Sequence, residues 1–220
     1  MRPLNTYIDH TALKPTTTRA AIEQLCVEAK QYRFASVCIN PCYVSLCRQL
    51  LTDSSVAVCT VIGFPLGANT TDIKVAEAKK AITDGADELD MVINSAALID
   101  GDNDYVRNEI KAIVGCTGGR VVKVIIETGL LSNEQKIRAT RLCCEAGATF
   151  VKTCTGMTQG VATVEDVKLI KQNITGNVKI KASGGIRTKA DALALIEAGA
   201  DRIGASAGIA ILEGSSGMNG

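Results

Sequence analysis

The chain of 220 residues predicts a single-domain α/β protein folded as a (β/α)8 TIM barrel. Short β-branched runs alternate with helix-like stretches, which is typical of a parallel sheet whose strands are joined by helices. Three of these helices end in Gly-Ala, at Gly85, Gly147 and Gly199, where a glycine supplies the left-handed backbone that ends a helix before a strand. Eight strands in so short a chain favour a closed barrel. An open doubly wound sheet stays the alternative, because periodicity alone does not show closure.

The strands are predicted from runs rich in β-branched residues, of which the first and the last are weak on their own. They span 6–9, 35–40, 56–62, 88–94, 121–127, 149–153, 178–182 and 202–205. The predicted helices span 16–33, 70–85, 132–147, 163–172 and 188–199. The first begins with threonines suited to capping, and Ser132 with Gln135 has the spacing of a capping box.

The domain boundaries follow from the absence of any linker or low-complexity run inside the alternating pattern. We expect the barrel to occupy residues 1–213. The Gly/Ser-rich segment 214–220 is expected to be a flexible tail.

Composition excludes several classes of protein. The chain has 24 basic and 23 acidic residues, and a net charge of +1 argues against binding to nucleic acid or to an anionic membrane surface. The longest uncharged stretch, 54–71, contains Pro65 and several polar residues, so no membrane span is expected. Nine cysteines form no C-x-x-C pair and the N-terminus lacks a signal peptide, which favours a reduced cytoplasm.

Candidate catalytic groups lie where the predicted strands end, because barrel enzymes place their active sites at the carboxyl ends of the strands. The polar residues at these ends are Asp9, Asn40, Asp90, Glu127, Lys152 and Lys181. His10 is the only histidine, so a two-histidine metal site is not expected, and a buried structural role suits it better than catalysis. No carboxylate motif supports a magnesium site, and we expect neither a metal nor a cofactor.

Lys152 and Lys181 stand out because they lie near the ends of neighbouring predicted strands. Two inward-pointing ammonium groups about 6 Å apart would repel by about 2.8 kcal/mol at an effective dielectric constant near 20, or roughly two pKa units. Desolvation acts in the same direction, so one of the lysines is a candidate neutral amine for Schiff-base formation. The alternative is that each lysine extends from a strand end to solvent, and we expect this for Lys123 and Lys179.

Glycine-rich turns follow the last two predicted strands, where barrels commonly bind phosphate. Gly184 and Gly185 follow Lys181, and Gly204 to Gly208 lead into a further helix. Backbone N–H groups approach an anion closely at such turns, although each turn alone is equally compatible with a structural role. Together they favour a phosphorylated substrate.

Eight sequence blocks, in order and without large gaps from about Tyr7 to Gly208, resemble the deoxyribose-phosphate aldolase family. The blocks are YIDHTALKP, SVCINP, VCTVIGFPLGA, GADELDMVIN, KVIIETGLL, FVKTCTG, KASGGIRT and GADRIGAS. Each block is modestly specific, whereas the ordered set is highly specific. The resemblance implies a (β/α)8 barrel and a metal-free class I aldolase that cleaves 2-deoxy-D-ribose 5-phosphate reversibly to acetaldehyde and D-glyceraldehyde 3-phosphate.

The resemblance also assigns roles that the residues by themselves left open. Lys152 is implied to be the Schiff-base lysine, Lys181 the lysine that depresses its pKa, and Asp90 the proton-shuttling acid. Position at a strand end does not by itself show which of Lys152 and Lys181 is the nucleophile. Nor does it distinguish Asp90 from Asp9 or Glu127 as the acid. The expected substrate-binding residues are Asp9, Cys38, Asn40, Thr155, Gly184, Gly185, Gly204 and Ser206.

Several of these residues also have structural interpretations. Asp9 either hydrogen-bonds near the lysines or ends a strand, and Asn40 either orients a substrate hydroxyl or precedes Pro41 at a strand end. Cys38 is expected to line the acetaldehyde pocket or to serve in packing.

Three positions depart from the family pattern. Cys154 stands where members often have serine, Ala207 replaces the second of two adjacent serines, and the C-terminal tyrosine of some members is absent. These changes bear on affinity and rate more than on the type of reaction.

The alternatives are a Schiff-base aldolase for another sugar phosphate, a metal-free sugar-phosphate isomerase with Asp90 as base, and a non-catalytic phosphate-binding barrel. The expected partners are a small sugar phosphate and aldehydes, and the resemblance suggests a homodimer or homotetramer.

Overall fold

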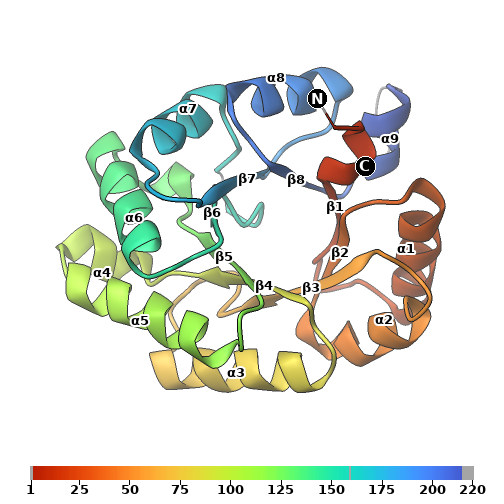
Figure 1. The fold of residues 1–220 in the computed structure, drawn as a ribbon, viewed down its shortest axis with the longest axis horizontal. Helices are drawn as coiled ribbons and strands as arrows, with labels where there is room; N and C mark the ends of the chain where they lie inside the picture. The colour runs from red at the N-terminus through yellow and green to blue at the C-terminus, as the bar shows by residue number, and fades with distance from the viewer. Residues whose placement is uncertain (1, 159, 215–220) are drawn as a thin grey trace.

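Eight parallel strands close into a ring that is surrounded by helices, as the computed structural model of residues 2–158 and 160–214 shows (Figure 1). Each strand pairs with the next along the chain, and the last pairs with the first. The predicted (β/α)8 barrel is therefore confirmed and the open sheet is wrong. The expected tail lies outside the described residues from position 215 onward.

The strands match the predicted runs to within a few residues at each end. They are β1 (Ile8–Ala12), β2 (Ser36–Ile39), β3 (Ala57–Ile62), β4 (Glu88–Val92), β5 (Val121–Ile125), β6 (Phe150–Lys152), β7 (Lys179–Ser183) and β8 (Arg202–Ala205). β1 begins two residues later than expected, because a 3₁₀ helix, η1 (Leu4–Tyr7), occupies the start of its predicted run. Two further 3₁₀ helices are η2 (Pro41–Tyr43) and η3 (Thr128–Leu130).

All five predicted helices are present, and the described residues contain four more. The predicted ones are α1 (Arg19–Tyr32), α3 (Thr71–Thr83), α6 (Asn133–Glu145), α7 (Val164–Asn173) and α8 (Lys189–Ala198). The others are α2 (Val44–Leu50), α4 (Ser95–Asp100), α5 (Asn103–Cys116) and α9 (Gly208–Glu213), of which only α9 was indicated by the sequence. No helix in the described ranges is long and apolar enough to cross a membrane.

The helix ends follow the local signals in the sequence. The hydroxyl of Thr18 accepts a hydrogen bond from the backbone of Ala21, and Ser132 with Gln135 forms the reciprocal capping box. Gly85 and Gly147 have positive φ angles of 106° and 81° just after the last residues of α3 and α6. These glycines turn the chain directly into the next strand.

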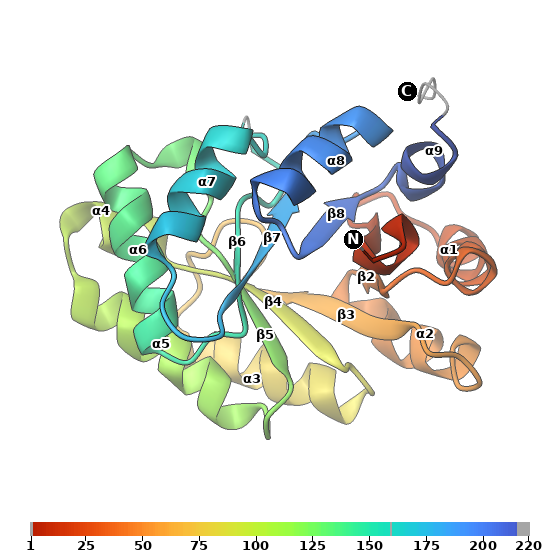
Figure 2. The ribbon, with the colours of Figure 1, turned by 45° about the horizontal axis from the view of Figure 1, so that its top comes forward.

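The main apolar core lies between the outside of the ring and the helices around it. Figure 2 shows α9 next to η1, where the last helix covers the start of the chain and β1. A smaller apolar cluster is separate from this core and consists of Leu13, Cys38, Cys59 and Val61, with Phe64 against it.

A buried ion pair ties α3 and α5 to the end of β4. Nζ of Lys74 lies 2.6 Å from Oε1 of Glu109, and both side chains are fully buried. Lys74 also donates to the carbonyl of Val92, and Glu109 accepts from the backbone of Asn94. Because both charges are satisfied, the pair is tolerated in the interior, but neither partner is tolerated alone.

Replacing one partner of this pair is therefore expected to destabilise the fold strongly. We expect Lys74→Met to lower the free energy of unfolding by about 3–5 kcal/mol, because Glu109 is left buried and unpaired. Urea unfolding measures this loss. Lys80→Met, which breaks the exposed Lys80–Asp84 pair on the same helix, is expected to change stability by about 0.5 kcal/mol or less. Similar losses in the two variants would contradict the prediction.

Candidate active site

Two lysines converge on one carboxylate inside the barrel, toward the carboxyl ends of the strands. Lys152 is the last residue of β6 and pairs in register with Lys181 in the middle of β7. Their Nζ atoms lie 2.8 and 2.7 Å from the same oxygen of Asp90, on β4. The lysines are 2% and 0% exposed, and Asp90 is fully buried. The structure thus brings together the three residues that were predicted to be catalytic.

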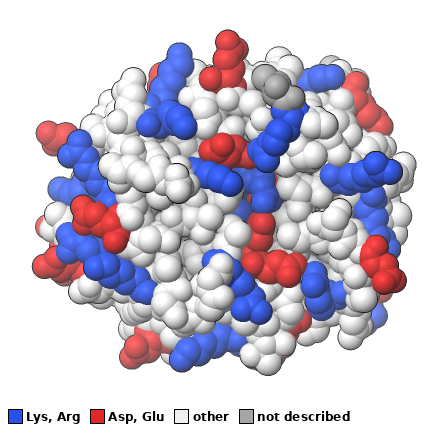
Figure 3. All heavy atoms as spheres, viewed as in Figure 1, with Lys and Arg blue, Asp and Glu red and all other residues white. Residues whose placement is uncertain are grey.

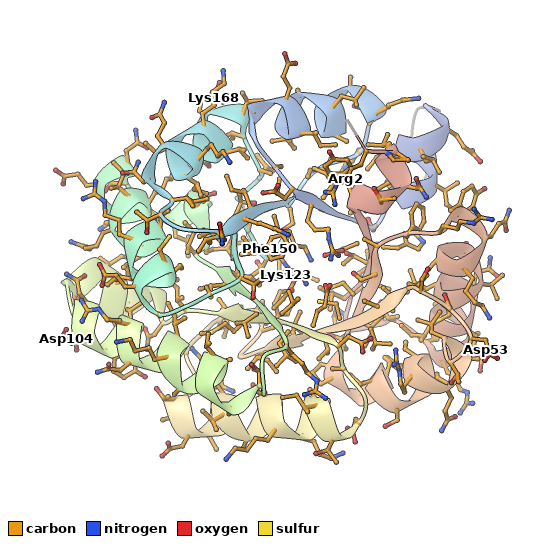
Figure 4. The ribbon with its side chains drawn as sticks, viewed as in Figure 1. Arg2, Asp53, Asp104, Lys123, Phe150 and Lys168 are labelled. Atoms are coloured by element: carbon orange, nitrogen blue, oxygen red, sulfur yellow. The ribbon has the colours of Figure 1, made fainter. Side chains whose placement is uncertain are left out.

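A third lysine completes the surroundings of Asp90 and corrects an expectation. Lys123, in the middle of β5, is fully buried and lies within the ring of strands (Figure 4). Its Nζ lies 2.8 Å from the other oxygen of Asp90 and 2.6 Å from Glu88. The expectation that Lys123 reaches solvent is wrong, because its side chain points into the barrel. Lys179, at the start of β7, is exposed as expected.

Asp9 and Arg202 extend this charge network toward the amino ends of the strands. Oδ2 of Asp9 lies 2.5 Å from Nζ of Lys181. The guanidinium of Arg202 binds the other oxygen of Asp9 and both oxygens of Glu88. Asp9 therefore contacts Lys181, which agrees with the interpretation that it hydrogen-bonds near the lysines.

The charges determine the protonation states of this network. Burial opposes ionisation of Asp90, but the ammonium groups of Lys123, Lys152 and Lys181 outweigh it and hold the pKa of Asp90 well below its usual range. Burial likewise opposes the charge of Lys181, yet Asp9 and Asp90 raise the pKa of Lys181 above its ordinary value. Asp90 is therefore a carboxylate and Lys181 an ammonium group at neutral pH.

Repulsion within the lysine pair does not lower the pKa of Lys181, contrary to one possibility that the sequence left open. The prediction counted two ammonium groups, whereas the structure places carboxylates between and below them. Asp9 and Asp90 both lie within 2.7 Å of Lys181. Lys181 thus keeps its proton at neutral pH.

Thiols form one wall beside Asp90. Cys38 and Cys59 pair in register on β2 and β3, and their Sγ atoms lie 3.9 and 3.1 Å from the carboxylate. Within the described residues, these three groups are the set spaced closely enough to share a metal ion. The three ammonium groups around Asp90 oppose a cation there, so the donor set is a poor metal site. The thiols belong instead to the small apolar cluster with Leu13 and Val61.

A glutamate holds the segment that follows Lys152. Glu127 has a left-handed backbone, with φ of 54°, at the end of β5. Its carboxylate accepts hydrogen bonds from the backbone of Thr155 and from the hydroxyl of Thr158. No hydrogen bond or ion pair joins Glu127 to the lysines in the described ranges, so the structure separates it from Asp90 as a positioning group. Thr155 is buried, and its hydroxyl accepts from the backbone of Met157.

The predicted phosphate turns lie at the same end of the barrel. Gly184 and Gly185 have φ angles of 105° and 75°, and the carbonyl of Gly184 accepts from the backbone of Ala162. A side chain on Gly185 would lie only 2.7 Å from Val161. Ser206 is exposed between β8 and α9. The positive φ angles and the close contact with Val161 explain why glycine occupies this turn.

Gly204 has a different reason to be glycine. It lies within β8, in register with Asp9 and Ser183 on its two neighbours. A Cβ atom there would lie 2.9 Å from Cε of Lys181 and 2.8 Å from Cβ of Ser183. Gly204 thus makes room for the lysine side chain, in addition to any contact with substrate.

The remaining predicted residues also make contacts within the protein. Nδ2 of Asn40 lies 3.5 Å from the carbonyl of Lys14, so Asn40 joins two loops at the end of β2. His10 is buried and its Nε2 lies 2.8 Å from Glu28, which suits the structural role expected for it. Sγ of Cys154 lies 3.3 Å from the hydroxyl of Thr128, beneath the loop that follows Lys152.

Sequence reasoning missed Lys123, Glu88, Arg202 and Cys59 as parts of the site. Strand alternation contained a signal for two of them, since Glu88 and Asp90 are two apart and share a face of β4. Lys123 pairs in register with Asp90 across β4 and β5. A lysine in the middle of an apolar run that is buried on both faces must point into the barrel or into the helix layer.

Comparison with known proteins agrees with this geometry. Residues 4–214 match the model of the DeoC/LacD family aldolases. A deoxyribose-phosphate aldolase of Thermoanaerobacter sp. (strain X514) is 58% identical over 209 residues, which cover 94% of each chain. The enzyme of that name from Streptococcus suis (strain 98HAH33) is 55% identical over 212 residues, which cover 96% of each chain. The tetrameric structure of deoxyribose phosphate aldolase from Aeropyrum pernix superposes with a TM-score of 0.90 at 33% identity, covering 98% of this chain and 92% of that one.

The contacts of Glu127 predict that it orders the segment after Lys152. We expect Glu127→Gln to raise amide hydrogen exchange about 10-fold or more over residues 155–158 and 160–162, because a charge-assisted acceptor for two donors is weakened. Exchange followed by mass spectrometry measures the effect. Glu134→Gln, on the exposed first turn of α6, is the control and is expected to leave this segment unchanged. Equal exchange in the two variants would refute the positioning role.

Asp9 predicts an acid-dependent loss of stability. Burial raises the pKa of Asp9, but the positive charges of Lys181, Arg202 and Lys123 lower it by more than burial raises it. The pKa in the folded protein therefore lies below the ordinary value of 3.8. A depressed pKa stabilises the fold above the unfolded value, and this contribution is lost as pH falls below about 4. We expect Asp9→Asn to flatten the decline of the unfolding free energy between about pH 5 and pH 2.

Urea unfolding across this pH range checks the prediction. Asp9→Asn is also expected to be less stable at pH 7, so the slope with pH is compared and not the absolute value. Asp53→Asn removes a carboxylate that projects outward at the periphery, and should keep the wild-type slope (Figure 4). A wild-type slope in Asp9→Asn would show that Asp9 does not titrate as inferred.

Proposed function

The chain belongs to the DeoC/LacD aldolase family, and we propose that it cleaves 2-deoxy-D-ribose 5-phosphate reversibly to acetaldehyde and D-glyceraldehyde 3-phosphate through a Schiff base on Lys152. The observation that carries this proposal is the buried pair of Lys152 and Lys181 on one oxygen of Asp90. A lysine, a proton acceptor and a fixed positive charge thus meet at one point, which suits imine chemistry.

Schiff-base formation begins with attack of the Lys152 amine on C1 of the open-chain sugar. The new C–N bond forms as the carbonyl oxygen takes up a proton, and the nitrogen gives up one of its own. Asp90 lies 2.8 Å from this nitrogen and is ionised, so it accepts that proton and returns it to the hydroxyl that leaves as water. The product is an iminium ion bonded to Lys152.

Carbon–carbon cleavage uses the iminium ion as an electron sink. Acetaldehyde has two carbons, so the bond that breaks is C2–C3. The C3 hydroxyl gives its proton to Asp90 through a water molecule, C3 becomes the aldehyde of glyceraldehyde 3-phosphate, and the bonding electrons form an enamine with C2. Asp90 and a water molecule then protonate C2, and a second water hydrolyses the imine to acetaldehyde and the free lysine.

Lys181 supplies a charge in this scheme and takes no part in bond formation. Asp9 and Asp90 keep it protonated, and it lies in register with Lys152 on the neighbouring strand. Its ammonium group and Nζ of Lys152 lie on the same oxygen of Asp90.

Substrate placement follows the two sides of the site. The two-carbon end of the sugar would lie against Cys38 and its apolar neighbours, next to Asp90. The phosphate would lie at Gly184, Gly185 and Ser206, with Thr155 between the two ends. Asp9, Asn40 and Gly204 complete the proposed substrate-binding set, with Asp9 and Gly204 acting by way of Lys181.

We further propose that the protein works as a homo-oligomer in the cytoplasm without a metal or cofactor. A relative with a tetrameric structure supports an oligomer. Each of the nine cysteines has a free thiol, which suits a reducing compartment.

Borohydride trapping tests the nucleophile. Incubation with acetaldehyde and borohydride is expected to add one reduced ethyl group to Lys152, which peptide mass mapping locates. Lys152→Leu is expected to lose cleavage of deoxyribose phosphate by about 10³-fold or more while keeping its fold, because no other amine lies at that position. Lys168→Leu, on the outer surface of α7, is the matched control and should retain normal turnover (Figure 4).

The outcomes separate the proposed reaction from its alternatives. An adduct on Lys152 without cleavage of deoxyribose phosphate would point to an aldolase for another sugar phosphate. Conversion of the substrate to a ketose without trapping would favour an isomerase. Normal turnover in Lys152→Leu would overturn the assignment of the nucleophile.

A further inference from the structure

A cavity lies at the opposite end of the barrel from Lys152. It has a volume of about 440 Å³ and is lined by residues at the starts of β6, β7 and β8 and by the segment before β1. This size is within the range of small-molecule sites. We call it the N-terminal pocket. Its charged lining residues are Arg2, Lys171, Lys179, Asp201 and Arg202. Basic and acidic side chains lie side by side around the hollow at the middle of this face (Figure 3).

The charges in the N-terminal pocket are not balanced. Four of its residues are cationic and Asp201 is the one acid among them. Neither Lys171 nor Lys179 forms an ion pair with a residue in the described ranges, and Arg2 bonds only to the backbone carbonyl of Asp201. One oxygen of Asp201 is already occupied by the backbone N–H of Ile180. Arg202 is paired with Asp9 and Glu88. The other three cations share the single carboxylate of Asp201, which leaves the cavity with an excess of positive charge.

The cationic side chains are held around the cavity by their neighbours. The guanidinium of Arg2 lies 4.2 Å from the ring centre of Tyr7. Lys179 and Arg202 lie 5.8 and 5.9 Å from the ring centre of Phe150, at the same barrel end as Arg2 (Figure 4). The stem of Lys171 passes over Gly199, where an added Cβ would lie 3.3 Å from it. Cations arranged in advance around a hollow lower the cost of binding an anion.

We propose that the N-terminal pocket binds a phosphate-bearing anion with two or more negative charges, and that its occupancy changes the reactivity of Lys152 through Arg202. Several cations around one cavity suit a phosphate group, whose oxygens accept from more than one donor at once. The space exceeds that of a single phosphate, so a diphosphate or an organic phosphate fits.

Arg202 connects the pocket to the reaction site. Its guanidinium lines the cavity and also binds Asp9 and Glu88. Asp9 contacts Lys181, and Lys181 and Lys152 share one oxygen of Asp90. An anion on Arg202 competes with Asp9 and Glu88 for its donors, and so changes the charge that these carboxylates present to the lysines. This coupling rests on the proposed function, whereas the binding itself does not.

Calorimetric titration with inorganic pyrophosphate at low salt tests the binding. The pocket variant carries Lys171→Gln and Lys179→Gln. The control variant carries Lys111→Gln and Lys168→Gln, which remove equal charge from exposed positions on α5 and α7. We expect the wild type and the control to show two classes of site, one of them at the phosphate turns. The pocket variant should lose one class or bind there at least about 10-fold more weakly. Identical titrations of all three proteins would overturn the proposal.

Initial rates of deoxyribose phosphate cleavage test the coupling. Pyrophosphate is expected to change kcat in the wild type and the control, and to raise only KM in the pocket variant. If pyrophosphate changed only KM in all three proteins, it would be acting at the phosphate turns, and the coupling would be refuted. Absence of cleavage would count against the proposed function. Calorimetry needs no turnover, so it would still test anion binding at the N-terminal pocket.

Discussion

The barrel interior depends on the carboxylate of Asp90, on whose two oxygens three lysine ammonium groups converge. A buried carboxylate or ammonium group costs several kcal/mol unless an opposite charge meets it with good geometry. Lys123, Lys152 and Lys181 come from three adjacent strands, and each reaches Asp90 on β4 within 2.8 Å. The same contacts that make the charges tolerable therefore hold Lys152, the proposed nucleophile, beside Asp90, its proposed proton acceptor.

Charged side chains occupy positions inside this barrel that layers of aliphatic side chains commonly fill in other barrels. Arg202, Glu88 and Asp9 continue the network below Asp90, so that ion pairs link the reaction site to the opposite end of the barrel. The aliphatic side chains pack mainly outside the ring, against the helices. One consequence is that chemistry at either end of the barrel is electrostatically connected to the other.

Much of the fold was predictable because its signals are local. β-branched runs, helix caps and glycines after helix ends each lie within a few residues of the element they define, and all eight strands were found. The short helices α2 and α4 were missed, and so was the longer α5, although its buried residues Val106, Ile110 and Ile113 recur at helical spacing. Lys152 and Lys181 were found as a pair by their strand positions, but Asp90 was separated from Asp9 and Glu127 only by family resemblance. Lys123 was assigned to solvent because the direction of a strand side chain depends on pairing.

The sequence by itself determined which segments become strands and helices, which residues lie at the strand ends, and which family the pattern resembles. Only the tertiary structure decided which charges meet, because contact between strands depends on register and closure. Arg202 binds Asp9 across 193 positions of sequence, and Arg2 bonds to Asp201 across 199. Closure of β8 onto β1 brings these distant residues together, and no local pattern in the chain specifies that distance.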